Sequence, residues 1–214
     1  MKCYMLRDRF VVGWTVDILC LDLEGVLVPE IWQEVAKSTG IEELRKTTRD
    51  IPDYDELMTY RLGIVDEHDI KLSQIQRDIR SLKPLDGALE FLNWARSEYQ
   101  VFVVSDTFYE FARPLMEQLQ NPSLFCHRLI IKEDRIEGYQ LRQEDPKKKT
   151  VEALKSLNYR VIASGDSFND LSMLMAADVG YFYRPPANIV ELHPNFPVAE
   201  NYSELKQLIL DSFK

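Results

Sequence analysis

The stretch Ile18-Leu19-Cys20-Leu21-Asp22-Leu23-Glu24-Gly25-Val26 decides how this chain of 214 residues folds. It begins with four consecutive apolar residues and changes abruptly to a carboxylate at Asp22. Short apolar runs of this kind are typical of strands buried on both faces of a sheet. The side chains of Asp22 and Glu24, two residues apart in extended backbone, point to the same side. Gly25 then permits a tight turn or a close backbone approach, so the strand end is a candidate chemical site.

Three similar apolar runs follow later in the chain, at residues 101–104, 161–163 and 179–182. Helical patterns lie between them, one beginning at Asp86 as a capping residue and one over residues 151–157. Strands that alternate with helices predict an α/β fold with a Rossmann-like parallel sheet and right-handed crossovers. Such sheets bind ligands at the carboxyl ends of their strands, where polar residues follow each run in this sequence.

Two segments do not fit this alternation. Residues 30–83 contain three amphipathic helical patterns and predict a small helical domain inserted after the first strand. Residues 124–143 have β-rich flanks around the turn-like residues 132–135, which is typical of a hairpin. We therefore expect residues 16–29 and 84–214 to form the core of the fold.

Composition excludes several classes of protein. The net charge of −9 lacks the basic character of a nucleic-acid binder, and 45% apolar residues are enough for a sizeable core. Cys3, Cys20 and Cys126 have no recognisable spacing and are interpreted as reduced thiols, which favours the cytoplasm. The apolar stretch 10–23 is interrupted by Asp17, so no membrane span is predicted. A small molecule is the expected partner, bound by a monomer or a homodimer.

The second strand end carries Ser105, Asp106 and Thr107. A hydroxyl together with the amides of a starting helix forms a pocket for an anion. Residues 107–110 have the sequence of a capping box, which predicts that a helix begins there. The alternative is that Ser105 and Thr107 only cap this helix.

The third strand end has the sequence Gly165-Asp166-Ser167-Phe168-Asn169-Asp170. Asp166, Asn169 and Asp170 offer the oxygen ligands that Mg²⁺ prefers, and Ser167 with Asp170 can cap a helix. Upstream stands the lysine run 147–149. A solvated helix start is the ordinary interpretation of such a run, and we keep it for two of these three lysines.

Taken in order, these motifs resemble the haloacid dehalogenase (HAD) superfamily of phosphotransferases, and the helical insert matches the position of that superfamily's type 1 cap. Within it, the chain is most similar to the phosphoserine phosphatases, in particular the branch that is also a phosphoserine:homoserine phosphotransferase. The resemblance runs from about Val16 to the C-terminus and leaves residues 1–15 as an extension: an extra strand, a disordered arm or an upstream start codon. The supporting stretches are residues 20–32, 48–55, 105–111 and 138–143.

The resemblance implies roles for individual residues. Asp22 would be the nucleophile that forms an aspartyl-phosphate, and Glu24 the general acid and base. Mg²⁺ would offset the repulsion between the carboxylate and the phosphate. The implied metal ligands are Asp22, Glu24, Asp166 and Asp170, with Glu24 contributing through its main chain. The implied phosphate contacts are Ser105, Asp106 and Lys147, of which Lys147 is also catalytic.

The resemblance also assigns the amino-acid end of the substrate. Glu30 would bind the ammonium group of phosphoserine, Arg61 would bind its carboxylate through a bidentate fork, and Asn169 would add a contact. The alternatives are that Glu30 is a first-turn helix acid and that Arg61 is a surface residue paired with Asp66.

Two features stand outside the common pattern. Most of the superfamily has Asp where this chain has Glu24, a difference shared with the closer branch. The histidines, His68, His127 and His193, are separate from the motifs in sequence and are expected to be structural or surface residues.

The leading hypothesis is a Mg²⁺-dependent phosphoserine phosphatase that also transfers phosphate to homoserine. Two alternatives stay open: a phosphatase for another small phosphate ester, and a non-enzymatic phosphoacceptor or binding module.

Overall fold

The structure, a computed structural model, describes residues 5–6, 9–10, 16–47, 50–51 and 53–214. A seven-stranded sheet has the order β6-β5-β4-β3-β7-β8-β9 and is parallel except for the β5–β6 pair. The predicted α/β fold with a parallel sheet is confirmed. The strands are β3 (Asp17–Leu21), β4 (Gln100–Phe108), β5 (Ser123–Lys132), β6 (Arg135–Gln140), β7 (Arg160–Gly165), β8 (Val179–Tyr183) and β9 (Val198–Ala199).

Helices cover both faces of this sheet because the central strand is apolar on both sides. Leu19 and Leu21 of β3 point into one hydrophobic cluster, and Ile18 and Cys20 point into the other. The first cluster includes residues of α4 (Ala88–Glu98), α5 (Tyr109–Gln118) and α9 (Tyr202–Asp211). The second includes residues of α6 (Pro146–Ser156), α7 (Leu171–Ala176) and α8 (Ala187–Leu192).

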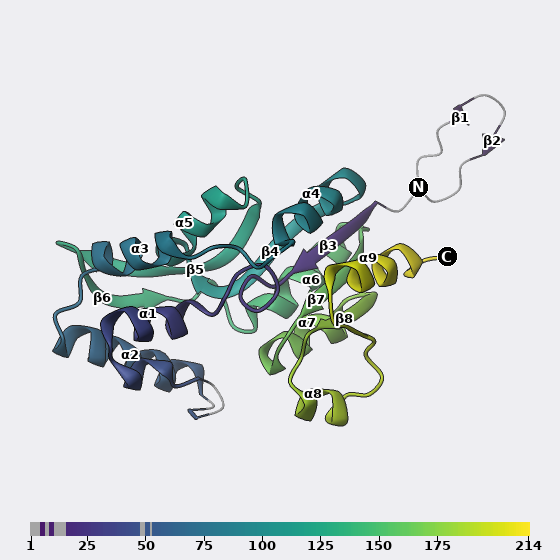
Figure 1. The fold of residues 1–214 in the computed structure, drawn as a ribbon. Coiled ribbons are helices and arrows are strands. Elements are labelled where there is room, and N and C mark those ends of the chain that lie inside the picture. Colours follow the sequence, from purple (N-terminus) through teal and green to yellow (C-terminus); the bar gives the residue numbers. More distant parts are fainter. Residues whose placement is uncertain (1–4, 7–8, 11–15, 48–49, 52) are drawn as a thin grey trace.

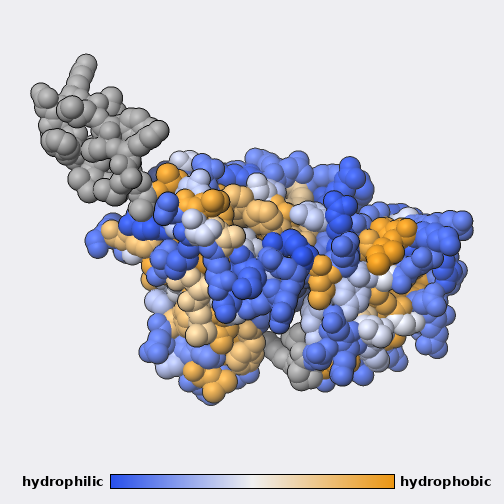
Figure 2. All heavy atoms as spheres, turned by 180° about the vertical axis from the view of Figure 1, so that it is seen from behind, coloured by the Kyte–Doolittle hydropathy of each residue, from blue (hydrophilic) through white to orange (hydrophobic). Residues whose placement is uncertain are grey.

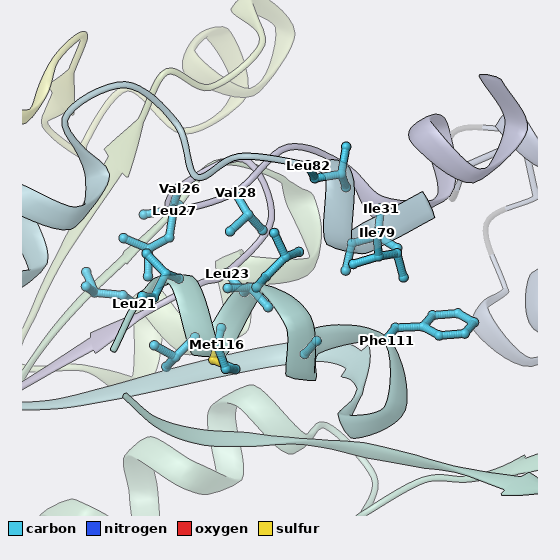
Figure 3. Close-up of a cluster of buried hydrophobic side chains, with 14 of the residues drawn as sticks. Leu21, Leu23, Val26, Leu27, Val28, Ile31, Ile79, Leu82, Phe111 and Met116 are labelled. Carbon is cyan, nitrogen blue, oxygen red and sulfur yellow. The ribbon is translucent and has the colours of Figure 1, made fainter. Parts of the chain in front are cut away.

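The segment between β3 and α4 is helical, as the amphipathic patterns predict. It contains α1 (Ile31–Thr39), the 3₁₀ helix η1 (Glu42–Arg45), α2 (Tyr54–Glu67) and α3 (Leu72–Ser81). Figure 1 shows α1, α2 and α3 at the end of the molecule toward which β3 points. Their apolar faces continue the first core cluster: Ile31, Ile79 and Leu82 lie next to the residues that follow β3 (Figure 3). We call these helices the cap.

The hairpin predicted over residues 124–143 is present as β5 and β6. It extends beyond the body of the sheet and lies beside the cap (Figure 1). At its turn, Asp134 accepts hydrogen bonds from the backbone of Leu72 (2.9 Å) and from the main chain and hydroxyl of Ser73 (2.9 and 2.6 Å). Arg135 of the hairpin binds Asp66 (2.7 Å) of the cap. The hairpin is therefore attached to the cap by both hydrogen bonds and an ion pair.

Two predicted helix starts are wrong. Residue 86 does not cap α4: Gly87, with φ +83°, occupies the N-cap and makes no side-chain cap hydrogen bond. Residues 107–110 form no capping box, because β4 continues to Phe108 and α5 begins only at Tyr109 without a side-chain cap. The carboxylate of Glu110 instead accepts a hydrogen bond from the backbone of Leu129 in β5 (2.9 Å).

Of residues 1–15, the structure describes two short strands, β1 (Met5–Leu6) and β2 (Arg9–Phe10), which pair antiparallel with each other. The remaining expectations for this extension, and for Cys3, lie outside the described residues. Among the described helices none is long and apolar enough to span a membrane. On the face shown in Figure 2, hydrophilic side chains predominate between small hydrophobic groups.

Candidate active site

The polar residues that follow β3, β4 and β7 meet because these three strands are adjacent and parallel. Asp22 follows β3, Ser105 and Asp106 lie near the carboxyl end of β4, and Asp166 follows β7. This placement agrees with the general position of ligand sites in parallel α/β sheets. The sequence motifs at the three strand ends therefore form one site.

Asp22 is buried and fixed from both sides. Its backbone N–H donates to the carbonyl of Ser164 (2.9 Å), and its Oδ1 accepts from the backbone of Leu23 (2.8 Å). The same oxygen lies 3.0 Å from Nζ of Lys147. Burial and the charge of Asp170 raise the pKa of Asp22 well above its usual value, against the opposing effect of Lys147. A carboxylate so poorly solvated needs a further positive charge beside it.

Lys147 is the buried cation of the site. It lies in the first turn of α6, and its Nζ is 2.6 Å from Asp170 Oδ1 and 3.5 Å from Asp106 Oδ2, in addition to its contact with Asp22. Burial opposes its charge, but these three carboxylates raise the pKa of Lys147 above its usual value. The other two lysines of the run pair with Glu152 at the surface, as expected for a solvated helix start.

Asp170 organises the third strand end. Its Oδ2 accepts from the backbone N–H groups of Asp166 (2.9 Å) and Ser167 (3.0 Å). The contact with Ser167 is part of the predicted capping box, which is present. Its other oxygen binds Lys147. Both oxygens of this fully buried carboxylate are thus engaged in holding the loop and the lysine, which leaves Asp166 more available to a ligand.

The residues present fit a hard divalent cation. Asp22, Asp166 and Asp170 each offer a carboxylate oxygen, and the three oxygens lie within 4.8 Å of one another. Burial, and after it the negative charges of Asp170 and Glu30, raise the pKa of Asp166 to about 7. Oxygen donors and uncompensated negative charge are what Mg²⁺ requires. The carboxylate of Glu24 does not belong to this group of described acids.

The backbone of Gly25 lies directly against the Asp166 carboxylate. A Cβ at this position would be 2.4 Å from Asp166 Cγ, and the residue has φ +74°, which disfavours side chains. Gly25→Ala is expected to lower kcat at least tenfold by displacing Asp166 and to cost about 1 kcal/mol of stability through backbone strain. Steady-state kinetics and denaturant unfolding measure these two effects.

Gly40→Ala is the matched control for this variant. Gly40 has nearly the same backbone conformation, with φ +72°, but no atom lies within 4 Å of a Cβ built there. The control should lose similar stability and keep its kcat. Equal activity of the two variants would contradict a role for the close approach at Gly25.

Glu24 lies at the boundary between the core and the cap. Its Oε1 accepts a hydrogen bond from the backbone of Ile31 (2.7 Å), the first residue of α1. Burial and the neighbouring charge of Glu30 raise the pKa of Glu24 to about 8, while Ile31 and Arg61 oppose the shift. Glu30 is the N-cap residue of α1. A carboxyl group with this pKa carries a proton at neutral pH and can donate it.

Arg61 is buried in α2 and does not pair with Asp66, which binds Arg135 instead. Its Nη2 donates to the carbonyl of Lys46 (2.6 Å), and its guanidinium lies 4.8 Å from the centre of the Trp32 ring. Within the described part of the chain, Nε of Arg61 has no hydrogen-bond partner. A buried donor without a partner is costly, so this nitrogen is suited to an anionic group of a ligand.

The carboxylate of Asp106 is unsuited to bind phosphate directly. Burial alone would raise its pKa, but Lys147, His127 and Asn169 together lower the pKa of Asp106 to about 2. An anion held in its ionised form repels a phosphate oxygen, so a phosphate contact here would come from the main chain. Asn169, predicted to bind substrate, donates its amide to Asp106 Oδ2 (2.9 Å) in this structure.

Sequence reasoning missed two residues of this neighbourhood. His127, separate from the motifs in sequence and expected to be a structural or surface residue, is buried, and its Nε2 lies 3.8 Å from Asp106 Oδ1. Tyr54, the first residue of α2, donates its hydroxyl to the carbonyl of Asp106 (2.8 Å). The pairing of Phe108 with His127 between β4 and β5 brings the histidine here, and its spacing in the sequence gives no signal of this contact.

Comparison with known proteins assigns the chain to a family. The haloacid dehalogenase-like hydrolases match residues 16–178 of the chain. The chain belongs to this family. The resemblance stated from the motifs is thereby confirmed. The matching family is one of hydrolases. The comparison therefore does not support the alternative of a non-enzymatic phosphoacceptor module.

Two curated relatives cover most of this HAD-like chain. A phosphoserine phosphatase of Pseudomonas syringae pv. tomato is 58% identical over 193 residues, which are 90% of this chain and 81% of that protein. Phosphoserine phosphatase ThrH of Pseudomonas aeruginosa is 56% identical over 196 residues, or 91% and 96% of the two chains. A crystal structure of a phosphoserine phosphatase in its apo form has the same fold, with a TM-score of 0.75 at 21% identity over 92% of this chain and 99% of that one.

Proposed function

We propose that this protein is a Mg²⁺-dependent phosphoserine phosphatase that forms a phosphoryl intermediate on Asp22 and also passes the phosphoryl group to homoserine. The observation that carries this proposal is the contact of the buried Asp22 carboxylate with Lys147 (3.0 Å) within the acidic cluster of Asp22, Asp166 and Asp170. The two curated relatives, both named phosphoserine phosphatases, support the choice of substrate. The name ThrH of one relative supports the transfer to homoserine.

The first half of the reaction transfers the phosphoryl group to Asp22. Oδ1 of Asp22 accepts from Leu23 and contacts Lys147, so we assign the attack to Oδ2. The bond from this oxygen to phosphorus forms while the bond from phosphorus to the serine oxygen breaks, and Glu24 protonates that leaving oxygen. Lys147 and the Ser105 hydroxyl hold phosphoryl oxygens. Mg²⁺ held by Asp22, Asp166 and the main chain at Glu24 would supply positive charge against the phosphate. Asp170, the fourth implied ligand, orients Lys147 through its Oδ1.

In the second half Glu24 acts in the opposite direction. Having lost its proton, its carboxylate takes one from water, whose oxygen attacks phosphorus and releases Asp22 and inorganic phosphate. Homoserine follows the same course when its hydroxyl replaces water as the acceptor. The pKa of about 8 at Glu24, caused by burial and by Glu30, suits a group that gives and takes a proton near neutral pH.

The cap supplies groups for the amino-acid end of the substrate. Arg61 offers Nε, which has no hydrogen-bond partner among the described residues, and Glu30 provides a negative charge for the ammonium group near Glu24. Both residues lie on cap helices or their ends, and the charges of both act on Glu24. This arrangement supports a substrate that carries an ammonium and a carboxylate beyond its phosphate.

Arg61→Lys tests the carboxylate contact. Because a lysine cannot form the two-pronged contact, kcat/KM for phosphoserine is expected to fall about 10- to 100-fold. Phosphoethanolamine lacks the carboxylate, so its turnover should change by less than about threefold. Arg77→Lys, at an exposed position of the cap, is the control and should leave the turnover of both substrates unchanged. An equal loss for both substrates would assign Arg61 a structural role.

The function itself is tested with the wild-type protein, Mg²⁺ and phosphoserine, with and without homoserine. We expect serine and inorganic phosphate in the first reaction, and phosphohomoserine in addition in the second, both followed by phosphorus NMR and mass spectrometry. If neither inorganic phosphate nor phosphohomoserine were formed, the proposal would be refuted. Faster turnover of another small phosphate ester in a substrate panel would favour the alternative phosphatase.

We also propose a cytoplasmic location, because Cys20 and Cys126 are free buried thiols.

A further inference from the structure

The segment that carries Ser105 and Asp106 departs from the regular sheet. Strand β4 pairs with β5 through Val104, loses register, and resumes pairing only at Phe108 opposite His127. Such an irregularity releases backbone groups from the ladder and redirects the side chains. Residues 105–107 therefore depend on contacts other than pairing with β5 to fix their backbone.

Apart from the contact with Lys147, three contacts from three different elements converge on Asp106. Its Oδ2 accepts from the amide of Asn169 (2.9 Å), which follows β7. Its Oδ1 faces His127 of β5. Nδ1 of His127 accepts a hydrogen bond from the backbone of Arg142 (3.0 Å), so the ring proton is on Nε2 and is directed at Asp106. The side chain of Asp106 is thus held by residues outside the cap.

The third contact comes from the cap and binds the main chain. Tyr54 donates its hydroxyl to the carbonyl of Asp106 (2.8 Å). Its ring is packed against His127 and Tyr139, with centroid distances of 6.0 and 6.3 Å. The ring is therefore held independently of its hydroxyl, and the hydroxyl connects the first turn of α2 to the peptide between Asp106 and Thr107.

We propose that Tyr54 is a positioning residue through which the cap sets the phosphate-binding segment. Its hydroxyl holds the Asp106 carbonyl, and the N–H of the same peptide, at Thr107, donates to Ser105 Oγ (3.2 Å). The contact thereby orients the Ser105 hydroxyl, whose proton is left for a phosphoryl oxygen. The inference rests on the proposed phosphatase function. It requires that the contact strengthens binding of the phosphate part of the substrate and leaves the amino-acid part, bound at Glu30 and Arg61, unaffected.

Tyr54→Phe removes only the hydroxyl, and Tyr60→Phe is the matched control on the same helix. The ring of Tyr60 contacts Lys46 instead of the phosphate segment. With the Mg²⁺-loaded proteins, titration calorimetry measures the dissociation constants of inorganic phosphate and of L-serine separately. For Tyr54→Phe we expect phosphate binding to weaken about fivefold, as for one lost hydrogen bond, and serine binding to change less than twofold. Tyr60→Phe should match the wild type for both ligands.

Hydrogen–deuterium exchange gives a second, independent measurement. Peptides covering residues 103–109 should exchange faster in Tyr54→Phe than in Tyr60→Phe, while the unfolding temperature stays the same. Unchanged phosphate binding, or an equal weakening of phosphate and serine, would overturn the proposal. Failure of the wild type to hydrolyse phosphoserine would instead count against the proposed function, because the phosphate titration needs no turnover.

Discussion

Asp22→Asn is expected to lower kcat for phosphoserine about 10⁴-fold or more, the largest effect of any single change in this chain. Asparagine keeps the shape of the side chain and an oxygen that can accept from Leu23, but its amide is not a nucleophile toward phosphorus. The loss should be in kcat, with KM changed little. Single-turnover kinetics with phosphoserine, together with mass spectrometry of the intact protein for a phosphorylated species, measure it.

The same variant should not lose stability. Burial and Asp170 raise the pKa of Asp22, so a neutral amide removes a charge that the metal-free protein accommodates poorly. We expect an unfolding temperature equal to or above that of the wild type in the presence of a chelator, and a smaller stabilisation by added Mg²⁺. Residual kcat above a few per cent of the wild type would mean that another group attacks phosphorus.

Asp17→Asn is the control on the same strand. Asp17 lies at the opposite end of β3 and pairs with Arg160 through two contacts of 2.7 and 2.8 Å. Because this half-exposed pair is remote from the site, its loss should cost about 1 kcal/mol at most and leave kcat unchanged. The contrast separates the chemistry at Asp22 from general damage to β3.

Lys147→Met is expected to lower turnover strongly and to destabilise the fold as well. The side chain is 2% exposed and is the cation that contacts Asp22, Asp106 and Asp170. Removing one partner of a buried ionic cluster leaves charges uncompensated and typically costs 3–5 kcal/mol. We expect a loss of about that size in denaturant unfolding and a decrease in kcat of at least about 10³-fold.

The lysine run supplies matched controls within the same helix turn. The side chains of Lys148 and Lys149 are 43% and 52% exposed and pair with Glu152. Exchange of either for methionine should change stability by less than about 0.5 kcal/mol and preserve activity. If Lys148→Met or Lys149→Met were as inactive as Lys147→Met, the assignment of the phosphate contact to Lys147 would be wrong.

The strands of this fold could be predicted because burial on both faces produces continuous apolar runs. Residues 18–21 predict β3 almost to the residue, as Asp17–Leu21 is observed. The start of α5 could not be predicted in this way. Residues 107–110 have the local sequence of a capping box, but pairing with β5 extends β4 through Phe108 and draws the Glu110 carboxylate to Leu129. Tertiary contacts outweigh a local capping preference here.

The acidic part of the site could also be predicted, because each carboxylate follows a strand whose end must lie beside the others. The contacts around Asp106 could not. His127 reaches it through the register of β4 with β5, and Tyr54 reaches it through the packing of the cap on the core. Neither contact leaves a periodic or spaced pattern in the sequence. Residues that reach a site from a distant element are found only when the chain is seen folded.

The attachment of the hairpin to the cap has a consequence for protein engineering. Asp134 binds the start of α3, Arg135 binds the end of α2, and the hydroxyl of Tyr139 donates to Asp55 (2.6 Å). A chimera that exchanges residues 30–83 with those of a relative would separate each of these pairs. To graft the specificity of one family member onto another, two stretches of gene must be transferred together, the one that encodes the cap and the one that encodes β5 and β6.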